Sequence, residues 1–257
     1  MVKVIALGGS SANVNPGQGC SGYLIDGDGA RVVLDLGPGT LIELLRHTEI
    51  GALDAIVITH MHIDHMLDLI ALWWGWMHHP IPLERSLPLW LPPGGSGSLR
   101  HTLSTLGRPD QVERFFGGVC SVNEYDPDSP LRIAGAVITF KPTSHFIPCW
   151  AVRCELGAAR VVYTADNGPA GNLLELARGA DLLIAESMSR IGSFQESEYR
   201  GTSTPLEAAR LAQEAGAKRL MLTHFSLPQD AEIGRKQAAE IFSGPIEVAV
   251  PGFTVEL

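Results

Sequence analysis

One short histidine-rich motif limits most strongly what this chain can fold into. The apolar run at 53–58 leads directly into the sequence THMHIDH at 59–65, and a largely apolar stretch follows at 66–77. A short, β-branched apolar run is typical of a buried strand, and the longer stretch favours a helix. The motif therefore lies where a strand ends and a helix begins.

Four side chains of this motif are able to bind metal ions. Along an extended chain residues two apart face the same way, so His60 and His62 can bind one ion. Asp64 and His65 open the predicted helix and point elsewhere, which suits a second ion. A histidine-rich surface turn is the alternative, but a solvated turn would not require a hydrophobic strand leading into it.

Three later segments also end apolar, strand-like runs: SH at 144–145, YTAD at 163–166 and LTHF at 222–225. Together with the motif at 59–65, and in this order, they resemble the H-x-H-x-D-H signature and later motifs of the metallo-β-lactamase superfamily. Within that superfamily, GGSS at 8–11 and SGYL at 21–24 are similar to the ribonuclease Z-like and cyclic-nucleotide phosphodiesterase-like branch. The resemblance covers nearly the whole chain.

The resemblance implies an α/β (α+β) fold, a four-layer αββα sandwich with the active groove along one edge. A faint internal repeat agrees with a duplicated half, because 31–57 and 160–184 both read as strand, turn, helix and strand. Hydrophobic residues make up 45% of the chain and charged residues 18%, which favours compact folding. Without a visible linker, we expect a single domain over 1–257.

The remaining predicted elements alternate along the chain. We predict strands at 2–7, 22–26, 31–36, 87–91, 131–140 (one strand or a pair), 150–156, 160–164, 181–185, 219–223 and 246–250. We predict helices at 41–47, 99–106, 111–116, 173–177, 206–215 and 233–242, with the glycine- and serine-rich run at 92–98 as a loop. Thr204 and Glu207 form a capping box for the helix at 206–215, and Gly216 ends it.

The resemblance also implies a set of metal ligands. One ion would be held by His60, His62 and His145, the other by Asp64, His65 and His224, and Asp166 would bridge both. Imidazoles and carboxylates suit two zinc ions, with manganese or iron as alternatives. Asp35 either orients these ligands from behind or caps a turn.

Other residues are candidates for contact with substrate. Trp73 and Trp76 lie on the helix that follows the motif; such aromatic groups are more often core, but they could wall the pocket. Glu186 either lines the substrate or makes structural hydrogen bonds. The full set of predicted substrate-binding residues is Ser10, Ser11, Trp73, Trp76, Glu186 and Ser203.

The chain departs from ribonuclease Z at two points. Those enzymes carry a histidine before a Ser/Thr-capped helix, where this chain has Thr202, so Thr202 is the catalytic candidate at that position. They also insert a tRNA-binding arm between the third and fourth motifs, but the predicted hairpin at 150–164 fills the interval between His145 and Asp166. With a formal net charge of −9 and no basic stripe, the chain is not expected to bind tRNA.

The predicted activity is hydrolysis by a hydroxide that the metal ions activate, with Asp64 positioning it and relaying its proton. The favoured substrate is a small anionic phosphodiester such as a cyclic nucleotide. The alternatives are a hydrolase of thioesters, lactones or β-lactams and a ribonuclease Z-like nuclease. A di-iron redox protein and a non-catalytic metal-binding module are less favoured.

The sequence also bears on location and assembly. The four cysteines, Cys20, Cys120, Cys149 and Cys154, show no C-x-x-C spacing, and their number does not indicate a disulfide scaffold. The start of the chain does not resemble a signal peptide, and no apolar run approaches the ~20 residues of a membrane span. We therefore expect a cytoplasmic protein without a membrane partner, and a homodimer as an open alternative.

Overall fold

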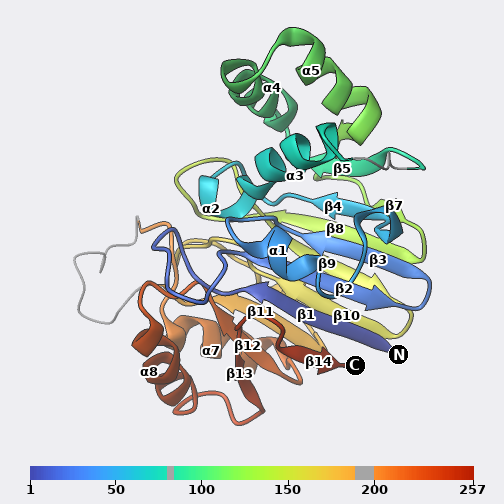
Figure 1. Ribbon diagram of the computed structural model, residues 1–257. Helices are drawn as coiled ribbons and strands as arrows, with labels where there is room; N and C mark the ends of the chain where they lie inside the picture. Colours follow the sequence, from blue (N-terminus) through green and yellow to red (C-terminus); the bar gives the residue numbers. More distant parts are fainter. Residues whose placement is uncertain (80–83, 189–199) are drawn as a thin grey trace.

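Two mixed sheets pack face to face, and helices cover the outer face of each (Figure 1). The computed structural model describes residues 1–79, 84–188 and 200–257. Within these ranges, each sheet has seven strands. The predicted four-layer αββα sandwich is therefore confirmed.

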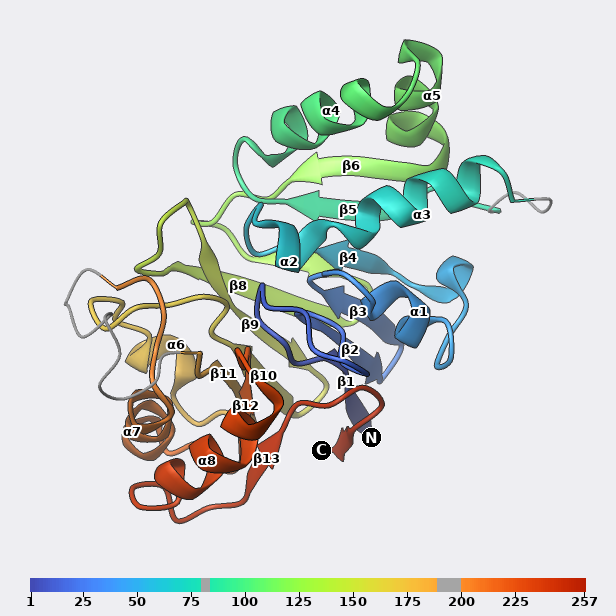
Figure 2. The same cartoon turned by 60° about the vertical axis from the view of Figure 1, so that its left-hand side comes forward.

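The first sheet contains the N-terminal strands and one strand from the C-terminus. Its order is β14 (Thr254–Glu256), β1 (Val2–Gly8), β2 (Gly22–Gly27), β3 (Ala30–Leu34), β4 (Ala55–Val57), β5 (Leu87–Leu91) and β6 (Cys120–Glu124). Strands β3 to β6 are parallel neighbours. The helices that pack on its outer face, seen clearly in Figure 2, are α1 (Thr40–Leu44), α3 (Asp68–Met77), α4 (Gly95–Leu106) and α5 (Pro109–Arg114).

The second sheet is formed by the later part of the chain. Its order is β13 (Ile246–Val248), β12 (Leu220–Thr223), β11 (Leu182–Glu186), β10 (Ala159–Tyr163), β9 (Trp150–Leu156), β8 (Ala136–Pro142) and β7 (Leu131–Ile133). Its outer face packs on α6 (Leu174–Ala177), α7 (Pro205–Ala215) and α8 (Pro228–Ala238). Among the described residues, no helix combines the length and the apolar character that crossing a membrane requires.

The alternation of side chains along the strands builds three apolar layers. In β1, Val4 and Ala6 face the core between the sheets, whereas Ile5 and Leu7 face the helices. Successive side chains of a strand point to opposite faces, so a strand covered on both sides is apolar throughout. This is why the central strands appear in the sequence as continuous apolar runs.

The functional motifs lie at the carboxyl ends of strands that run in the same direction. Strands β3 and β4 are parallel, as are β10, β11 and β12. Strand β8 shares the direction of β10, because both are antiparallel to β9. The short helix α2 (Ile63–Met66), which carries part of the motif, marks this edge of the sandwich at the left of Figure 1.

The internal repeat seen in the sequence recurs in the structure. Strand β3, helix α1 and strand β4 form one unit, and β10, α6 and β11 form the other. In both units the two strands are parallel neighbours. Each sheet thus contributes one copy of the unit to the edge that carries the motifs.

The helix predicted over 66–77 is interrupted, because α2 ends at Met66 and α3 begins at Asp68. The loop after β3 takes over two backbone bonds there: Leu36 N donates to His65 O at 2.8 Å, and Asp68 N donates to Leu36 O at 3.0 Å. These tertiary bonds replace the bonds of a continuous helix. They also tie the histidine motif to the first copy of the repeat.

Other element boundaries differ where a tertiary contact decides them. Helix α4 begins at Gly95, inside the run predicted as a loop, because the Glu124 carboxylate of β6 accepts from Gly94 N and Ser96 N, both at 2.9 Å. Helix α8 also begins earlier than predicted, and the range 131–140 is a strand pair. Strands β6 and β14 were not predicted.

The predicted capping box is formed at the start of α7. The hydroxyl of Thr204 accepts from Glu207 N at 3.3 Å, Glu207 Oε2 accepts from Thr204 N at 2.8 Å, and Gly216 ends the helix at φ 63°. We expect Thr204→Ala to lower the free energy of unfolding by about 1 kcal/mol, because helix amides lose their cap. Urea denaturation measures this, and Thr204→Ser should stay near the wild type. Equal stability of Thr204→Ala and the wild type would contradict the assigned cap.

Candidate metal centre

Seven side chains from both halves of the chain meet at the edge where the strands end. They form two groups that share Asp166, and within each group the potential ligand atoms all lie within 4.8 Å of one another. The first group is His60, His62, His145 and Asp166; the second is Asp64, His65, Asp166 and His224. These are the groupings that the resemblance implied.

Backbone geometry at the strand ends helps to direct these side chains. Asp35, Ala165 and His224 have φ angles of 59°, 50° and 65°, in the left-handed region that residues other than glycine seldom adopt. They follow β3, β10 and β12, and Ala165 immediately precedes Asp166. Such conformations cost energy and cluster at functional sites, where the surrounding structure maintains them.

In the first group the imidazoles converge through different nitrogen atoms. His62 Nδ1 lies 3.2 Å from His60 Nε2 and 2.9 Å from His145 Nε2. Asp166 Oδ2 lies 3.5 Å from His145 Nε2 and 3.8 Å from His60 Nε2. His62 therefore offers Nδ1, while His60 and His145 offer Nε2.

In the second group two carboxylates face two imidazoles. Asp166 Oδ1 lies 3.2 Å from His65 Nε2 and 3.4 Å from His224 Nε2. Asp64 Oδ2 lies 3.1 Å from His224 Nε2 and 3.5 Å from His65 Nε2. Asp166 thus presents one oxygen to each group, which is the arrangement of a bridging ligand.

Acceptors behind the imidazoles orient several of the ligands. Asp35 Oδ2 accepts from His65 Nδ1 at 2.7 Å, and the carbonyl oxygen of Gly201 accepts from His145 Nδ1 at 2.7 Å. An acceptor at one ring nitrogen fixes the proton there and leaves the other nitrogen free to bind a metal. Asp35 is therefore placed where it can orient the His65 ring. The Gly201 carbonyl was not predicted, because a backbone acceptor leaves no signal in residue types.

The donor atoms fit divalent metal ions. His65 Nε2 and Asp166 Oδ1 are buried and have no hydrogen-bond partner among the residues that the structure describes, although they lie 3.2 Å apart. Leaving buried polar atoms unsatisfied is costly, and a cation between them would satisfy both. Imidazole nitrogen and carboxylate oxygen are ligands that zinc, iron and manganese accept.

The protonation of the ligands follows from burial and from their neighbours. Burial, with the charge of His65, lowers the pKa of His60 well below its usual value. For His65, burial acts in the opposite direction to Asp166 and Asp35, whose charges hold its pKa well above the usual value. Burial likewise disfavours charged Asp166, but His224 and His65 hold its pKa well below the usual range. Without metal, protons on the second group therefore balance its carboxylates.

Glu186 makes structural hydrogen bonds, one of the two roles predicted for it, and its contact with substrate stays a prediction. Its side chain is buried, and Oε1 accepts from Asn167 N at 2.8 Å and Ser203 N at 2.9 Å. Burial raises its pKa to about 7. Ser203 is also buried, and its hydroxyl donates to Asn167 O at 2.5 Å. Both residues hold the loop that carries Asp166.

The two tryptophans do not face the metal groups. Trp73 is 1% exposed within the core of the first sheet, and its Nε1 donates to Gln111 O at 3.2 Å. Trp76 lines a separate cavity of about 850 Å³, whose lining contains none of the seven ligands. Helix α3 packs one face into the core and leads away from α2, so this placement does not support the predicted contact with substrate, which stays a prediction.

The N-terminal serines and Thr202 are buried as well. Ser10 Oγ accepts from Asn15 Nδ2 at 3.0 Å, and Ser11 Oγ accepts from Asn13 N at 3.3 Å, so both serines organise their own loop. Their contact with substrate stays a prediction. Thr202 is 4% exposed and directly follows Gly201, whose carbonyl contacts His145. A catalytic role for Thr202 stays a prediction.

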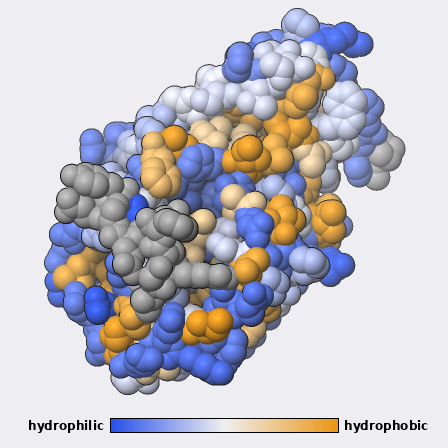
Figure 3. Space-filling model, turned by 90° about the vertical axis from the view of Figure 1, so that its left-hand side faces the viewer, coloured by the Kyte–Doolittle hydropathy of each residue, from blue (hydrophilic) through white to orange (hydrophobic). Residues whose placement is uncertain are grey.

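Exposed apolar side chains lie next to two of the metal-group histidines. Ile63 and Phe146 directly follow the ligands His62 and His145, and they are 63% and 67% exposed. The Phe146 ring lies 5.1 Å from the His145 ring. Figure 3 views this side of the molecule, where hydrophobic residues cross the middle of the face. The rim of the site is therefore partly apolar.

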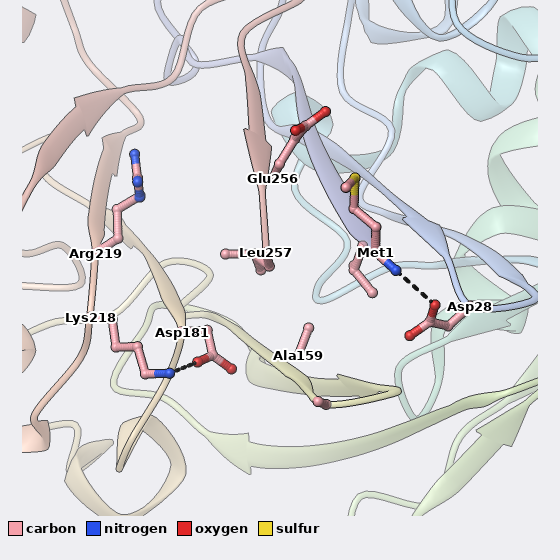
Figure 4. Close-up of a pocket in the computed structure, with 10 residues that line it drawn as sticks. Met1, Asp28, Ala159, Asp181, Lys218, Arg219, Glu256 and Leu257 are labelled. Carbon is pink, nitrogen blue, oxygen red and sulfur yellow. Dashed lines mark hydrogen bonds and ion pairs between the residues drawn. The ribbon is translucent and has the colours of Figure 1, made fainter.

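A cavity of about 440 Å³ lies at the opposite end of the strands, between the two chain ends (Figure 4). Several of its charged groups are paired: the Met1 amino group lies 3.1 Å from Asp28, and Lys218 lies 2.7 Å from Asp181. Arg219 is paired with Glu247 at 2.6 Å. Within the described part of the chain, none of the residues that line this cavity has a buried side-chain atom without a hydrogen-bond partner, so the candidate active site is the metal centre.

Comparisons with known proteins agree over the length of the chain. A family model described as "Beta-lactamase superfamily domain" matches residues 18–225. The Bacillus subtilis protein named "Probable metallo-hydrolase YhfI" is 30% identical over 259 residues, which cover 99% of this chain and 100% of that protein. Ribonuclease Z of Myxococcus xanthus is 27% identical over 306 residues, covering 100% of this chain and 98% of that one. The crystal structure of YhfI superimposes with a TM-score of 0.85 at 28% identity, over 100% and 99% of the two chains.

Metal binding should depend strongly on pH. Burial disfavours a proton on His224, but the charge of Asp166 and the hydrogen bond to Asp64 raise its pKa to about 10. The second group therefore holds protons in the absence of metal. An ion must displace such a proton, and lowering the pH favours the proton. We expect the apparent affinity for zinc to fall at least about tenfold per pH unit from pH 8 to pH 6.

Competition with a chelator of known affinity, corrected for the protonation of the chelator, measures this dependence at pH 6, 7 and 8. Proton release on zinc addition in weak buffer provides an independent reading. Zinc affinity that does not change with pH would show that these histidines are not the ligands.

Proposed function

This chain belongs to the metallo-β-lactamase superfamily, and from this premise we propose that it is a metal-dependent hydrolase of a small phosphodiester, such as a cyclic nucleotide. The observation that carries the proposal is that Asp166 belongs to both groups of potential metal ligands. Among the described residues, buried ligand atoms of the second group also lack a hydrogen-bond partner. Such a centre suits two ions rather than one. When bound, two divalent ions polarise the substrate and lower the pKa of water.

Asp64 is the residue that we propose to position the attacking water and accept its proton. It is 8% exposed at the edge of the second group, and Oδ2 contacts His224 Nε2 at 3.1 Å. Burial disfavours its charge, but the hydrogen bond from His224 and the charge of His65 lower its pKa below the usual value. Asp64 is therefore in its basic form at neutral pH.

Several observations support a small substrate rather than tRNA. Strands β9 and β10 pair directly and fill most of the chain between His145 and Asp166, where an arm would have to be inserted. The net charge of −9 opposes binding to a long polyanion. The apolar side chains of Ile63 and Phe146 beside the centre suit an uncharged part of a small molecule.

A phosphodiester is favoured over an acyl substrate by the relatives. Ribonuclease Z of Myxococcus xanthus is 27% identical, and its name describes a nuclease, which acts on phosphodiester bonds. The second candidate is a hydrolase of thioesters, lactones or β-lactams. It is retained because the same centre could stabilise the oxyanion of an acyl transfer. Zinc is the proposed metal, with manganese and iron as alternatives.

A substrate panel tests the proposal. The metal-reconstituted protein is assayed on bis(p-nitrophenyl) phosphate, a thioester and a lactone, and metal content is measured on the same sample. We expect phosphodiester turnover with two ions per chain. Turnover of only the thioester or lactone would support the second candidate, and bound iron without hydrolysis would favour a redox protein. Metal without turnover of any ester would favour a non-catalytic module.

His65→Ala and Asp166→Ala should each reduce phosphodiester turnover by at least about 100-fold. Each variant removes a proposed metal ligand and leaves the other ligands of its group without it. Circular dichroism and thermal unfolding check that the variants fold. His101→Ala is the matched control, since His101 is exposed on α4 and away from the centre. Metal-dependent turnover retained in both ligand variants would refute the assigned centre.

A further inference from the structure

The side chain of Thr59 lies between a carboxylate and a proposed metal ligand. Thr59 follows β4 and is 0% exposed. Its Oγ1 lies 2.9 Å from Asp35 Oδ2 and 3.0 Å from His60 Nδ1. Its backbone N also donates to Asp35 Oδ1 at 2.7 Å, so the residue is held firmly against the carboxylate.

The direction of these hydrogen bonds follows from the number of protons available. A hydroxyl has one hydrogen and two lone pairs, and a carboxylate only accepts. The Thr59 hydrogen must therefore point to Asp35, which leaves a lone pair facing His60 Nδ1. His60 consequently carries its proton on Nδ1, and its Nε2 is free towards His62 Nδ1 at 3.2 Å.

The same carboxylate oxygen also accepts directly from His65 Nδ1 at 2.7 Å. The geometry points to Thr59 as a positioning residue. Its hydroxyl donates to Asp35 and accepts from His60 Nδ1, so Asp35 orients His60 through Thr59. One carboxylate then holds one histidine of each metal group in the tautomer that binds metal. This inference rests on the two-ion centre of the proposed function.

A second threonine shows that position next to a ligand is not sufficient. Thr223 directly precedes His224 at the end of β12 and is also 0% exposed. Its Oγ1 lies 2.5 Å from the hydroxyl of Tyr23. Among the described residues, His224 Nδ1 has no hydrogen-bond partner, and the nearest carboxylate oxygen paired with it, Glu186 Oε2, lies 3.8 Å away. The connection at Thr59 therefore depends on Asp35, and Thr223 provides a matched control.

The test is Thr59→Val, which preserves the shape of the side chain and the backbone N–H but removes the hydroxyl. We expect the affinity for one of the two zinc ions to fall by about 10–100-fold, the usual effect of losing a partner behind a ligand. The other ion should keep its affinity, because Asp35 still contacts His65. Thr59→Ser should restore both affinities. Competition of the metal-free protein with a chelator resolves the two binding steps.

Three further variants separate positioning from general damage. Thr223→Val removes a buried hydroxyl of the same kind and should leave both affinities unchanged. Asp35→Asn should weaken both ions, and asparagine tolerates the φ of 59° at that position. In a His145→Ala background, which disables the first group, adding Thr59→Val should not weaken the remaining ion.

An NMR spectrum of the imidazole N–H groups provides a reading that does not involve metal. The metal-free wild type should show a protected Nδ1–H signal of His60, and Thr59→Val should lose it. Equal zinc affinities in Thr59→Val and the wild type would overturn the role of Thr59 and leave the two-ion centre standing. An equal loss in Thr223→Val would also overturn it. A wild-type chain that binds no zinc would refute the centre itself.

Discussion

The carboxylate of Asp166 is the group around which the two halves of the structure meet. It is 3% exposed, follows β10 of the second sheet, and faces histidines that follow β4 of the first sheet. Burying a charge is costly unless it is paired, and here imidazoles surround it on both sides. With one oxygen in each ligand group, Asp166 connects the two sheets electrostatically through His60 and His65.

Backbone contacts fix the histidine motif against the first sheet with little freedom. Ser21 N donates to Asp64 O at 3.2 Å, and Leu36 N donates to His65 O at 2.8 Å. A Cβ at Gly37 would lie 1.9 Å from Asp64 O, so only glycine allows this close approach. The interruption between α2 and α3 is the result of these bonds, and it gives Asp64 and His65 their directions.

Both side chains and a backbone carbonyl group orient the ligand histidines from behind. Asp35, with Thr59, serves histidines of both groups, while the Gly201 carbonyl serves His145. Glu186 and Ser203 hold the loop after β10. At the rim of the site, the exposed side chains of Ile63 and Phe146 provide apolar surface.

The sequence by itself determined the ligand types, their order and the layered fold. The spacing of 59–65, the apolar runs before each motif and the repeated strand–helix–strand unit are local patterns, and they follow from side-chain chemistry and strand periodicity. The capping box at Thr204 is local in the same sense.

Tertiary structure alone decided what surrounds the centre. Trp73 lies in the core because α3 turns one face into the sheet, and Glu186 lies behind the ligands because distant amides reach its carboxylate. The start of α4 likewise depends on Glu124 from another strand. Contacts between residues far apart in sequence leave no periodic trace, so only the folded chain shows which nitrogen of each histidine faces the metal groups and which acceptor holds the other.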